Sequence, residues 1–306
     1  MILMATLAEI LESTASSEET IVAVAAAADS EVLEAVHRSL ERNLASFRLF
    51  DDMGKLRSAM AQSHPYLSNH PKIQIHHAAD PQSAAEEAVK SVFNKESDVL
   101  MKGHIPTALL MKAVLQPEFG LRTDQILSHV AAFEIEGFER LLFVTDAGMN
   151  INPDLQRKAE ILQNAVFFAH SLGICMPVVA PLAAIEVINP VMQATVDAAA
   201  LTAMNKRGQI TGCIVDGPLA LDNAISLKAA KHKGIATKSA GLADILLVPN
   251  IESGNILYKS LVFFSKAKVG GVIVGAKAPI VLTSRADSAE TKLFSLALAI
   301  RSSSIQ

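Results

Sequence analysis

The segment most able to do chemistry lies near the C-terminus, where an apolar run ends at Leu282. Ser284 and Arg285 follow that run, and Asp287 and Glu290 come within the next turn. A guanidinium offers five donors in one plane, which suits phosphate or carboxylate binding better than a structural role at such a place. Asp287 and Glu290 also have the D-x-x-E spacing of a helix capping pair, so a structural role stays open for both.

A second candidate is the segment at the end of the predicted strand 98–105. Lys102, Gly103 and Thr107 stand where this predicted strand passes into a helix that begins near Pro106. The backbone amides and the positive end of the helix dipole favour an anion at such a place. The alternative is a solvated loop lysine followed by an ordinary residue of the helix cap.

Two more polar segments follow apolar runs, the first after Val144 and the second after Val248. Turn formation and helix capping explain both segments from local rules. The alternative is a site for a phosphate-bearing ligand. The second segment favours this alternative because a helix begins within it. The candidate binding residues of the two segments are Thr145, Asp146 and Asn150, and Ser253, Gly254, Asn255 and Lys259.

Short apolar runs alternate with segments of helical spacing along the whole chain, which predicts parallel sheets with crossover helices. In such folds ligands bind beyond the carboxyl ends of strands, where the polar segments above fall. The pattern predicts a helix that opens at Glu31 and a last helix over 287–302. The predicted strands are 21–28, 45–51, 72–76, 98–105, 140–148, 176–183, 210–217, 243–250 and 270–276, and a last strand is the apolar run 279–282 before Ser284.

Composition narrows the class of protein. The chain has 306 residues, of which 50% are hydrophobic and only 5% aromatic, so aliphatic side chains must build the core. Its net charge of −4 is not the basic footprint of a nucleic-acid-binding protein. No apolar stretch reaches the roughly 18 residues of a membrane span, and the N-terminus has glutamates where a signal peptide has lysines. We therefore expect a soluble, cytoplasmic protein that binds neither nucleic acid nor membrane.

The cysteines, the histidines and the lack of cofactor motifs all indicate a protein without a metal site or a tightly bound cofactor. Cys175 and Cys213 form no C-x-x-C, so we expect two buried free thiols. The nine histidines show no metal-ligand spacing, and we expect no metal site. The chain lacks G-x-G-x-x-G and G-x-S-x-G, and GGVIVGAK lacks the Gly-Lys-Ser/Thr of a P-loop. No tightly bound cofactor is expected.

Four segments that follow predicted strands resemble motifs of the phosphate acetyl/butyryltransferases and occur in the same order: VTDAGMNINPD, DGPLALDNAI, PNIESGNILYK and PIVLTSRADS. The resemblance runs from about Lys102 to the last helix, and KGHIPTALLMKAVL with ILSHVAAFE is most similar to the butyryl branch. It implies transfer of a short acyl group, butyryl favoured, between coenzyme A and inorganic phosphate, with acyl-CoA, CoA, phosphate and acyl phosphate as the ligands. It also implies no metal and at least a homodimer.

The implied fold has two α/β domains with mostly parallel sheets and a cleft between them, similar to isocitrate/isopropylmalate dehydrogenases. We place the first domain at 1–135 plus 283–306 and the second at 136–282.

The resemblance also implies roles for individual residues. Ser284 would polarise the thioester carbonyl or its tetrahedral intermediate, and Arg285 would hold phosphate. Where the acetyl branch has an aspartate seven positions after the serine, this chain has Thr291. The base that takes the CoA thiol proton must then be Asp287, which we favour, or Glu290. The family's G-N-x-x-Y-K motif falls on Gly254, Asn255, Tyr258 and Lys259.

Two other functions stay open at this point. A metal-dependent decarboxylating dehydrogenase of the same fold would need clustered aspartates, but the chain has no D-x-x-x-D. A non-catalytic acyl-CoA or acyl-phosphate sensor would keep the binding site and lose the base, which the departure at Thr291 allows. The sequence does not decide the length of the acyl chain, because one methylene changes binding by only about 1–3 kcal/mol.

Overall fold

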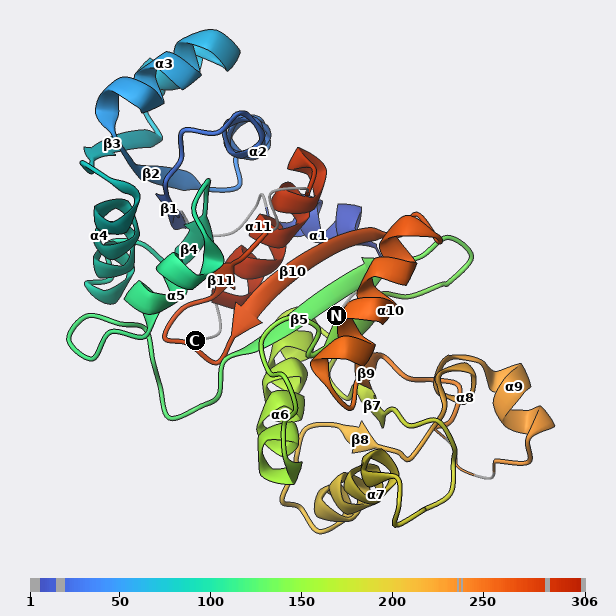
Figure 1. The fold of residues 1–306 in the computed structure, drawn as a ribbon. Coiled ribbons are helices and arrows are strands. Elements are labelled where there is room, and N and C mark those ends of the chain that lie inside the picture. Colours follow the sequence, from blue (N-terminus) through green and yellow to red (C-terminus); the bar gives the residue numbers. More distant parts are fainter. Residues whose placement is uncertain (1–5, 15–19, 236, 238, 284–286, 304–306) are drawn as a thin grey trace. The chain divides into compact units, whose positions relative to one another are not determined.

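The computed structural model describes residues 6–14, 20–235, 237, 239–283 and 287–303 (Figure 1). The chain divides into two compact units, which we call the terminal unit (Leu7–Gln125 and Gly270–Gln306) and the central unit (Met1–Thr6 and Ile126–Val269). The domain boundaries predicted from the sequence lie at 135 and 282, later in the chain than these.

The terminal unit has helices on both faces of a sheet with strand order β3-β2-β1-β4-β11-β10. All neighbouring strands from β3 to β11 are parallel, and β10 is antiparallel to β11. Its elements are α1 (Leu7–Thr14), β1 (Ile21–Ala25), α2 (Ser30–Glu41), β2 (Ser46–Asp51), α3 (Met53–Ser63), the 3-10 helix η1 (Pro65–Asn69), β3 (Ile73–His77), α4 (Pro81–Phe93), β4 (Val99–Lys102), α5 (Thr107–Val114), β10 (Lys268–Val274), β11 (Ile280–Val281) and α11 (Ala289–Ser303).

Local sequence explains how these helices begin. The Asp29 side chain accepts the backbone N–H of Val32 and so caps α2, and Asp80 caps α4 in a reciprocal pair with Ser83. The apolar residues that predicted a helix from Glu31 are buried in α2. Strand order then decides which face each helix covers. The connections from β1 to β2 and from β2 to β3 run one way along the sheet, and the connection from β3 to β4 runs the other way. Because crossovers between parallel strands are right-handed, α4, which lies in the last of these connections, covers the opposite face from α2.

The central unit has strand order β5-β6-β9-β7-β8, parallel except for the antiparallel β5–β6 pair. Its helices α6 and α7 pack along the strands on one face, and α10 packs on the other. The elements are β5 (Ser128–Glu134), β6 (Leu142–Thr145), α6 (Leu155–Ser171), β7 (Val178–Pro181), α7 (Gln193–Lys206), β8 (Ile214–Val215), α8 (Leu221–Ile225), α9 (Leu227–His232), β9 (Ile245–Leu247) and α10 (Ile251–Phe263).

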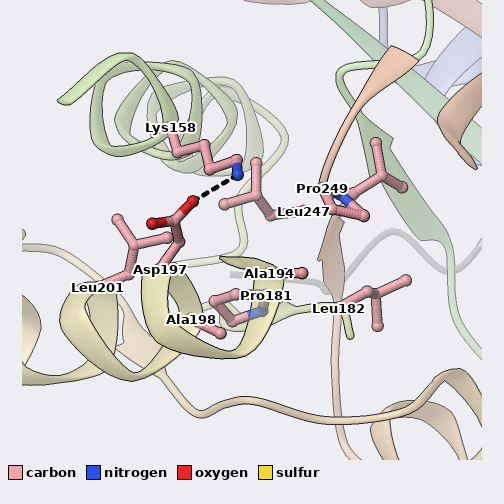
Figure 2. A pocket seen from close by; sticks show the side chains of 10 residues that line it. Lys158, Pro181, Leu182, Ala194, Asp197, Ala198, Leu201, Leu247 and Pro249 are labelled. Carbon is pink, nitrogen blue, oxygen red and sulfur yellow. Dashed lines mark hydrogen bonds and ion pairs between the residues drawn. The ribbon is translucent and has the colours of Figure 1, made fainter. Parts of the chain in front are cut away.

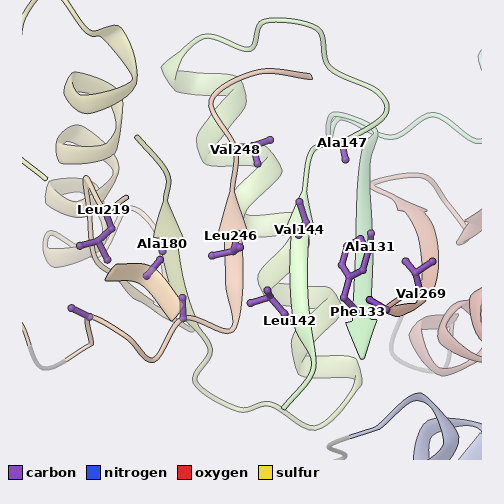
Figure 3. Close-up of a cluster of buried hydrophobic side chains, with 14 of the residues drawn as sticks. Ala131, Phe133, Leu142, Val144, Ala147, Ala180, Leu219, Leu246, Val248 and Val269 are labelled. Carbon is purple, nitrogen blue, oxygen red and sulfur yellow. The ribbon is translucent and has the colours of Figure 1, made fainter. Parts of the chain in front are cut away.

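One core of the central unit lies on the α10 face of its sheet. Figure 3 shows Leu142 and Val144 of β6 on the same face as Leu246 of β9, because side chains two positions apart on a strand share a face. Leu257 and Leu261 of α10 pack against this cluster. Phe143 points to the other face, where its ring meets Phe168 of α6 edge-on. The strands are therefore covered on both sides, which explains why they read as continuous apolar runs.

The structure confirms a mixed α/β fold with mostly parallel strands, and it adds one strand that the periodicity did not predict. The sequence of β5, SHVAAFE, neither alternates nor forms a continuous apolar run, because Ser128 and His129 open it and Glu134 ends it. The prediction of two buried thiols is wrong for Cys175, which lies in an exposed loop after α6, whereas Cys213 is buried. Within the described residues, none of the helices combines the length and the apolar character needed to cross a bilayer.

Candidate active site

The carboxyl edge of the terminal sheet gathers the first set of predicted site residues. β11 is parallel to β4, with Ile280 opposite Leu100 and Val281 opposite Met101. β4 is in turn parallel to β1. The segments that follow these three strands must therefore leave the sheet at the same edge. The chain order reverses between β1 and β4, and ligands of open α/β sheets bind at such a reversal.

Lys102 is buried at this edge, with only 4% of its surface exposed. Its ammonium donates to the backbone carbonyls of Gly103 and Ile105, both at 3.2 Å. The alternative of a solvated loop lysine is therefore wrong, because the side chain holds the loop after β4 in shape. Gly103 has a packing reason to be glycine, since a Cβ there would overlap the carbonyl oxygen of Ala26 at the end of β1.

The start of α5 follows this loop. Its cap residue is Pro106, which makes no side-chain capping bond, and Thr107 is exposed at the first helical position. The imidazole of His104 meets the Asp29 carboxylate at 3.1 Å, which ties the loop to the cap of α2. An exposed helix start without a capping side chain retains backbone donors that favour an anion.

The segment after β11 carries the predicted catalytic residues. Thr283 is buried at its start, whereas Ser284 and Arg285 lie outside the described residues. The backbone carbonyl of Asp287 accepts a hydrogen bond from the ammonium of Lys292. Lys292 is only 3% exposed, so α11 buries a cation directly behind this segment. Lys292 is a site residue that the sequence did not predict, since its one signal is a lysine that precedes the apolar stretch of α11.

The start of α11 differs from the prediction. The Ser288 hydroxyl accepts the backbone N–H of Thr291 at 3.2 Å, which is the bond of a helix cap to the third helical residue. The cap pair is thus Ser288 and Thr291, and the interpretation of Asp287 and Glu290 as the capping pair is wrong. Glu290 is exposed on the first turn.

The central unit brings together its own two polar segments. The backbone N–H of Val248, after β9, donates to the carbonyl of Thr145, and that of Ile251 donates to Ile151. At Gly254 a Cβ would lie 2.8 Å from the Asp146 carbonyl oxygen. Because β6 and β9 are parallel neighbours, their carboxyl ends bring the first turn of α10 against the loop after β6.

The polar side chains of the loop after β6 bond within the loop and to the neighbouring β5 segment. Asp146 is buried, and its carboxylate accepts the N–H groups of Gly148 and Met149 at 2.9 Å and the amide of Asn150 at 2.6 Å. The Thr145 hydroxyl donates to the backbone carbonyl of His129. These contacts agree with the turn-forming alternative and fix the shape of the loop.

The first turns of α10 present both engaged and exposed groups. Asn250 caps the helix, and its side-chain oxygen accepts the backbone N–H and the hydroxyl of Ser253. Asn255 and Lys259 are exposed one turn apart. The Lys259 ammonium lies 5.3 Å from the centre of the Tyr258 ring. Asn255 and Lys259 are thus the exposed members of the G-N-x-x-Y-K motif, whereas Tyr258 is half-buried.

A small pocket of about 10 Å³ lies nearby, beyond the ends of β7 and β9 (Figure 2). Apolar residues including Leu182 and Leu247 line it, and the buried ion pair of Lys158 and Asp197 closes one side at 2.7 Å. Ligand pockets usually measure roughly 300–1,000 Å³, so this space is too small for a coenzyme. The ion pair joins α6 to α7 and has a structural role.

Comparisons with known proteins agree with the resemblance of the motifs. The phosphate acetyl/butaryl transferase family matches residues 67–300. A probable phosphate butyryltransferase of Bacillus subtilis (strain 168) is 57% identical over 279 residues, 91% of this chain and 92% of the relative. A phosphate butyryltransferase of Clostridium beijerinckii is 50% identical over 278 residues, 91% of either chain.

A solved structure agrees with these sequence matches. The crystal structure of a branched-chain phosphotransacylase from Enterococcus faecalis V583 has a TM-score of 0.82 and 38% identity to this chain. The match covers 93% of this chain and 99% of that one. The family match and the alignments with these relatives each cover most of the sequence. The chain therefore belongs to the phosphate acetyl/butaryl transferase family.

Proposed function

We propose that this protein transfers a short acyl group, butyryl or a similar chain, between coenzyme A and inorganic phosphate. Family membership supports the reaction, and the names of the butyryltransferase and branched-chain relatives support an acyl chain longer than acetyl. The structural observation that carries the proposal is the shared edge of β4 and β11. There the buried Lys102 and Lys292 flank the segments that would bind an anionic substrate.

In this reaction a phosphate oxygen attacks the carbonyl carbon of the thioester and forms a tetrahedral intermediate. The C–S bond then breaks, the acyl phosphate forms, and the sulfur leaves as the thiolate of CoA. In the opposite direction the CoA thiol, with a pKa near ~8.5, must lose its proton before it attacks. No covalent acyl-enzyme is needed, and CoA acts as a substrate rather than a bound cofactor.

Three residues after β11 would perform the chemistry. We assign Arg285 to phosphate, because its planar donors match two phosphate oxygens. We assign Ser284 to the thioester carbonyl, where one well-placed donor contributes on the order of 10²–10³ in rate. Asp287 would take the thiol proton, and Glu290, exposed one turn later, is the alternative base.

The remaining residues divide into those that shape loops and those that meet substrate. In the terminal unit, Lys102 and Gly103 would shape the loop after β4, and Thr107 would offer an exposed helix start to phosphate. In the central unit, Asn255 and Lys259 would contact substrate through their exposed polar groups. We assign loop-shaping roles there to Thr145, Asp146, Asn150, Ser253 and Gly254.

We further propose that the protein is a cytoplasmic homodimer or larger homo-oligomer. The two units would correspond to the two domains of the isocitrate/isopropylmalate dehydrogenase-like fold, with 1–135 plus 283–306 and 136–282 as the functional division. These proposals rest on the resemblance of the motifs.

The test is phosphate-dependent release of thiol from butyryl-CoA by the purified protein, with acetyl-CoA and isobutyryl-CoA in parallel. We expect release to require phosphate, to yield acyl phosphate in equal amount, and to have a higher kcat/KM for the four-carbon substrates. Absence of thiol release with all three substrates would overturn the transferase proposal. A higher kcat/KM for acetyl-CoA would overturn only the acyl-chain preference.

A further inference from the structure

A group of metal-binding side chains lies in the terminal unit, on elements that the proposed reaction does not use. Glu34 and His37 are on α2, and His64 follows the last residue of α3. One ligand atom from each of the three lies within 4.8 Å of the other two. Tyr66 of η1 packs edge-on against the rings of both histidines, at 5.0 and 6.5 Å between centroids.

The two residues on α2 are placed by helix geometry. Positions three apart lie on the same face of a helix, so Glu34 and His37 project toward the same neighbour. That neighbour is the end of α3, where the Nε2 atom of His64 lies 2.8 Å from a carboxylate oxygen of Glu34. The imidazole rings of His37 and His64 are 4.9 Å apart between centroids. Two imidazoles and one carboxylate thus converge on a small volume.

Both histidines have a buried ring nitrogen that lacks a hydrogen-bond partner. Within the described residues, the Nδ1 atoms of His37 and His64 make no hydrogen bond. Their Nε2 atoms face carboxylates, that of His64 facing Glu34 and that of His37 lying 3.6 Å from Glu41. A neutral imidazole that donates from Nε2 keeps a lone pair on Nδ1. A buried lone pair without a partner is costly, and at His37 a metal ion would satisfy it. At His64 the Nε2 atom faces Glu34, so an ion bound by both residues would take the place of the hydrogen bond between them.

The surroundings resemble the outer contacts of known metal sites. Histidine ligands usually donate their second nitrogen to a carboxylate, which is the contact that Glu41 offers to His37. The Arg38 guanidinium holds the other carboxylate oxygen of Glu34. Arg38 opposes a cation by its charge, while it orients the carboxylate that the cation needs.

We propose that Glu34, His37 and His64 bind one divalent transition-metal ion of the zinc type, with water in the remaining position. Mixed imidazole and carboxylate ligands suit Zn²⁺, which is bound at about 2.0–2.2 Å by such atoms. Small side-chain rotations bring ligand atoms from within 4.8 Å to the spacing that these bonds require. The bound ion would join α2 to the end of α3, separate from acyl transfer.

The test is calorimetric titration of ZnCl₂ into the chelator-treated full-length protein, with the variants His37→Gln and His64→Gln. We expect one equivalent of Zn²⁺ to bind the wild-type protein and at least a 10-fold higher Kd in each variant. The matched control is His232→Gln, which removes an exposed histidine of the central unit and should leave the Kd unchanged. Far-UV circular dichroism without metal would verify that the variants are folded.

Two results would overturn the proposal: no binding of Zn²⁺ to the wild-type protein, or the same Kd in all four proteins. Glu34→Gln provides a third variant if a histidine variant fails to fold, because the amide keeps the size of the side chain. Co²⁺ offers a spectroscopic measurement. Visible d–d bands in the wild-type protein should weaken in His64→Gln and persist in His232→Gln, and bands unaltered by His64→Gln would contradict the ligand set.

Discussion

The carboxylate of Glu31 accepts a hydrogen bond from the backbone N–H of Ala289, 3.0 Å away and 258 positions later in the sequence. Glu31 is in the first turn of α2 and Ala289 is the first residue of α11. The bond therefore fixes the start of α11 directly after Ser284, Arg285 and Asp287. An acidic side chain from one helix satisfies a backbone donor that the other helix leaves without an intrahelical partner.

We expect Glu31→Ala to lower the free energy of unfolding by about 0.5–2 kcal/mol, the usual effect of losing a helix cap. It should also lower kcat, because the segment after β11 loses an anchor. Glu31→Gln keeps an oxygen acceptor and should retain most of the stability and most of kcat. Urea unfolding and thiol-release kinetics measure the two effects. The control, Glu87→Ala, removes an exposed ion pair on α4 and should change the free energy by less than about 0.5 kcal/mol. Equal effects of Glu31→Ala and Glu87→Ala would contradict the role of Glu31.

Arg285→Gln should raise the phosphate KM at least about 10-fold or abolish turnover, since the amide cannot replace a charged two-point contact with phosphate. The Kd for CoA should change little. Arg285→Lys keeps the charge and should give an intermediate KM. Initial rates over a range of phosphate concentrations and calorimetric titration of CoA separate the two effects. Wild-type phosphate kinetics in Arg285→Gln would remove this residue from the mechanism.

Asp287→Asn should lower kcat for acyl transfer to CoA by about 10²–10⁴-fold, the usual contribution of a general base. The loss should shrink at high pH, where the CoA thiol ionises without assistance. Glu290→Gln should leave kcat within a few-fold, because its carboxylate is not needed for the cap of α11. The pH profiles of both variants decide between the two carboxylates. Full activity of Asp287→Asn together with loss in Glu290→Gln would reverse the assignment.

Gly254→Ala should destabilise the central unit by about 1–3 kcal/mol, since the new Cβ would lie 2.8 Å from both the Asp146 carbonyl oxygen and a Val248 methyl group. The matched control is Gly148→Ala in the adjacent loop. There the Cβ would meet the His129 ring at 3.5 Å, an ordinary contact, and stability should change by less than about 0.5 kcal/mol. Thermal unfolding measures both variants. A Gly254→Ala protein as stable as the control would mean that α10 and the loop separate easily.

The two thiols should differ in reactivity. Cys175 is exposed, whereas burial raises the pKa of Cys213 from 9.0 to about 11. A thiol reagent at pH 8 should therefore modify one equivalent fast, and Cys175→Ser should remove that phase. The buried thiol also links stability to pH. Its pKa is higher in the folded protein than in the unfolded chain, so its contribution is complete below about pH 9 and is lost as pH rises toward 11.

Cys213→Ala measures that contribution. The wild-type protein should lose about 2–3 kcal/mol more than Cys213→Ala between pH 8 and 11. Urea unfolding at a series of pH values tests this difference. Parallel pH dependence in both proteins would show that the thiol ionises equally in the folded and unfolded states.

Most elements of the fold were predictable because their signals are local. The cap of α2 at Asp29 and the apolar face of that helix lie within a few turns of sequence. β5 escaped prediction because its polar residues Ser128, His129 and Glu134 leave neither an alternating pattern nor a continuous apolar run. The group around His64 could not be predicted from spacing, because Glu34 and His37 are close in sequence whereas His64 joins them only through the packing of α3 on α2.

The sequence by itself determined the α/β class, the order of the polar segments and the membership of the family, because motifs and periodicity lie within short stretches of chain. Only the tertiary structure decided that β11 lies beside β4, that Glu31 accepts the first backbone N–H of α11 and that Lys102 and Lys292 are buried. The physical reason is that pairing of distant strands and burial of charge depend on the packing of the whole unit. No local propensity encodes which residues, some 180 positions apart, share one edge of a sheet.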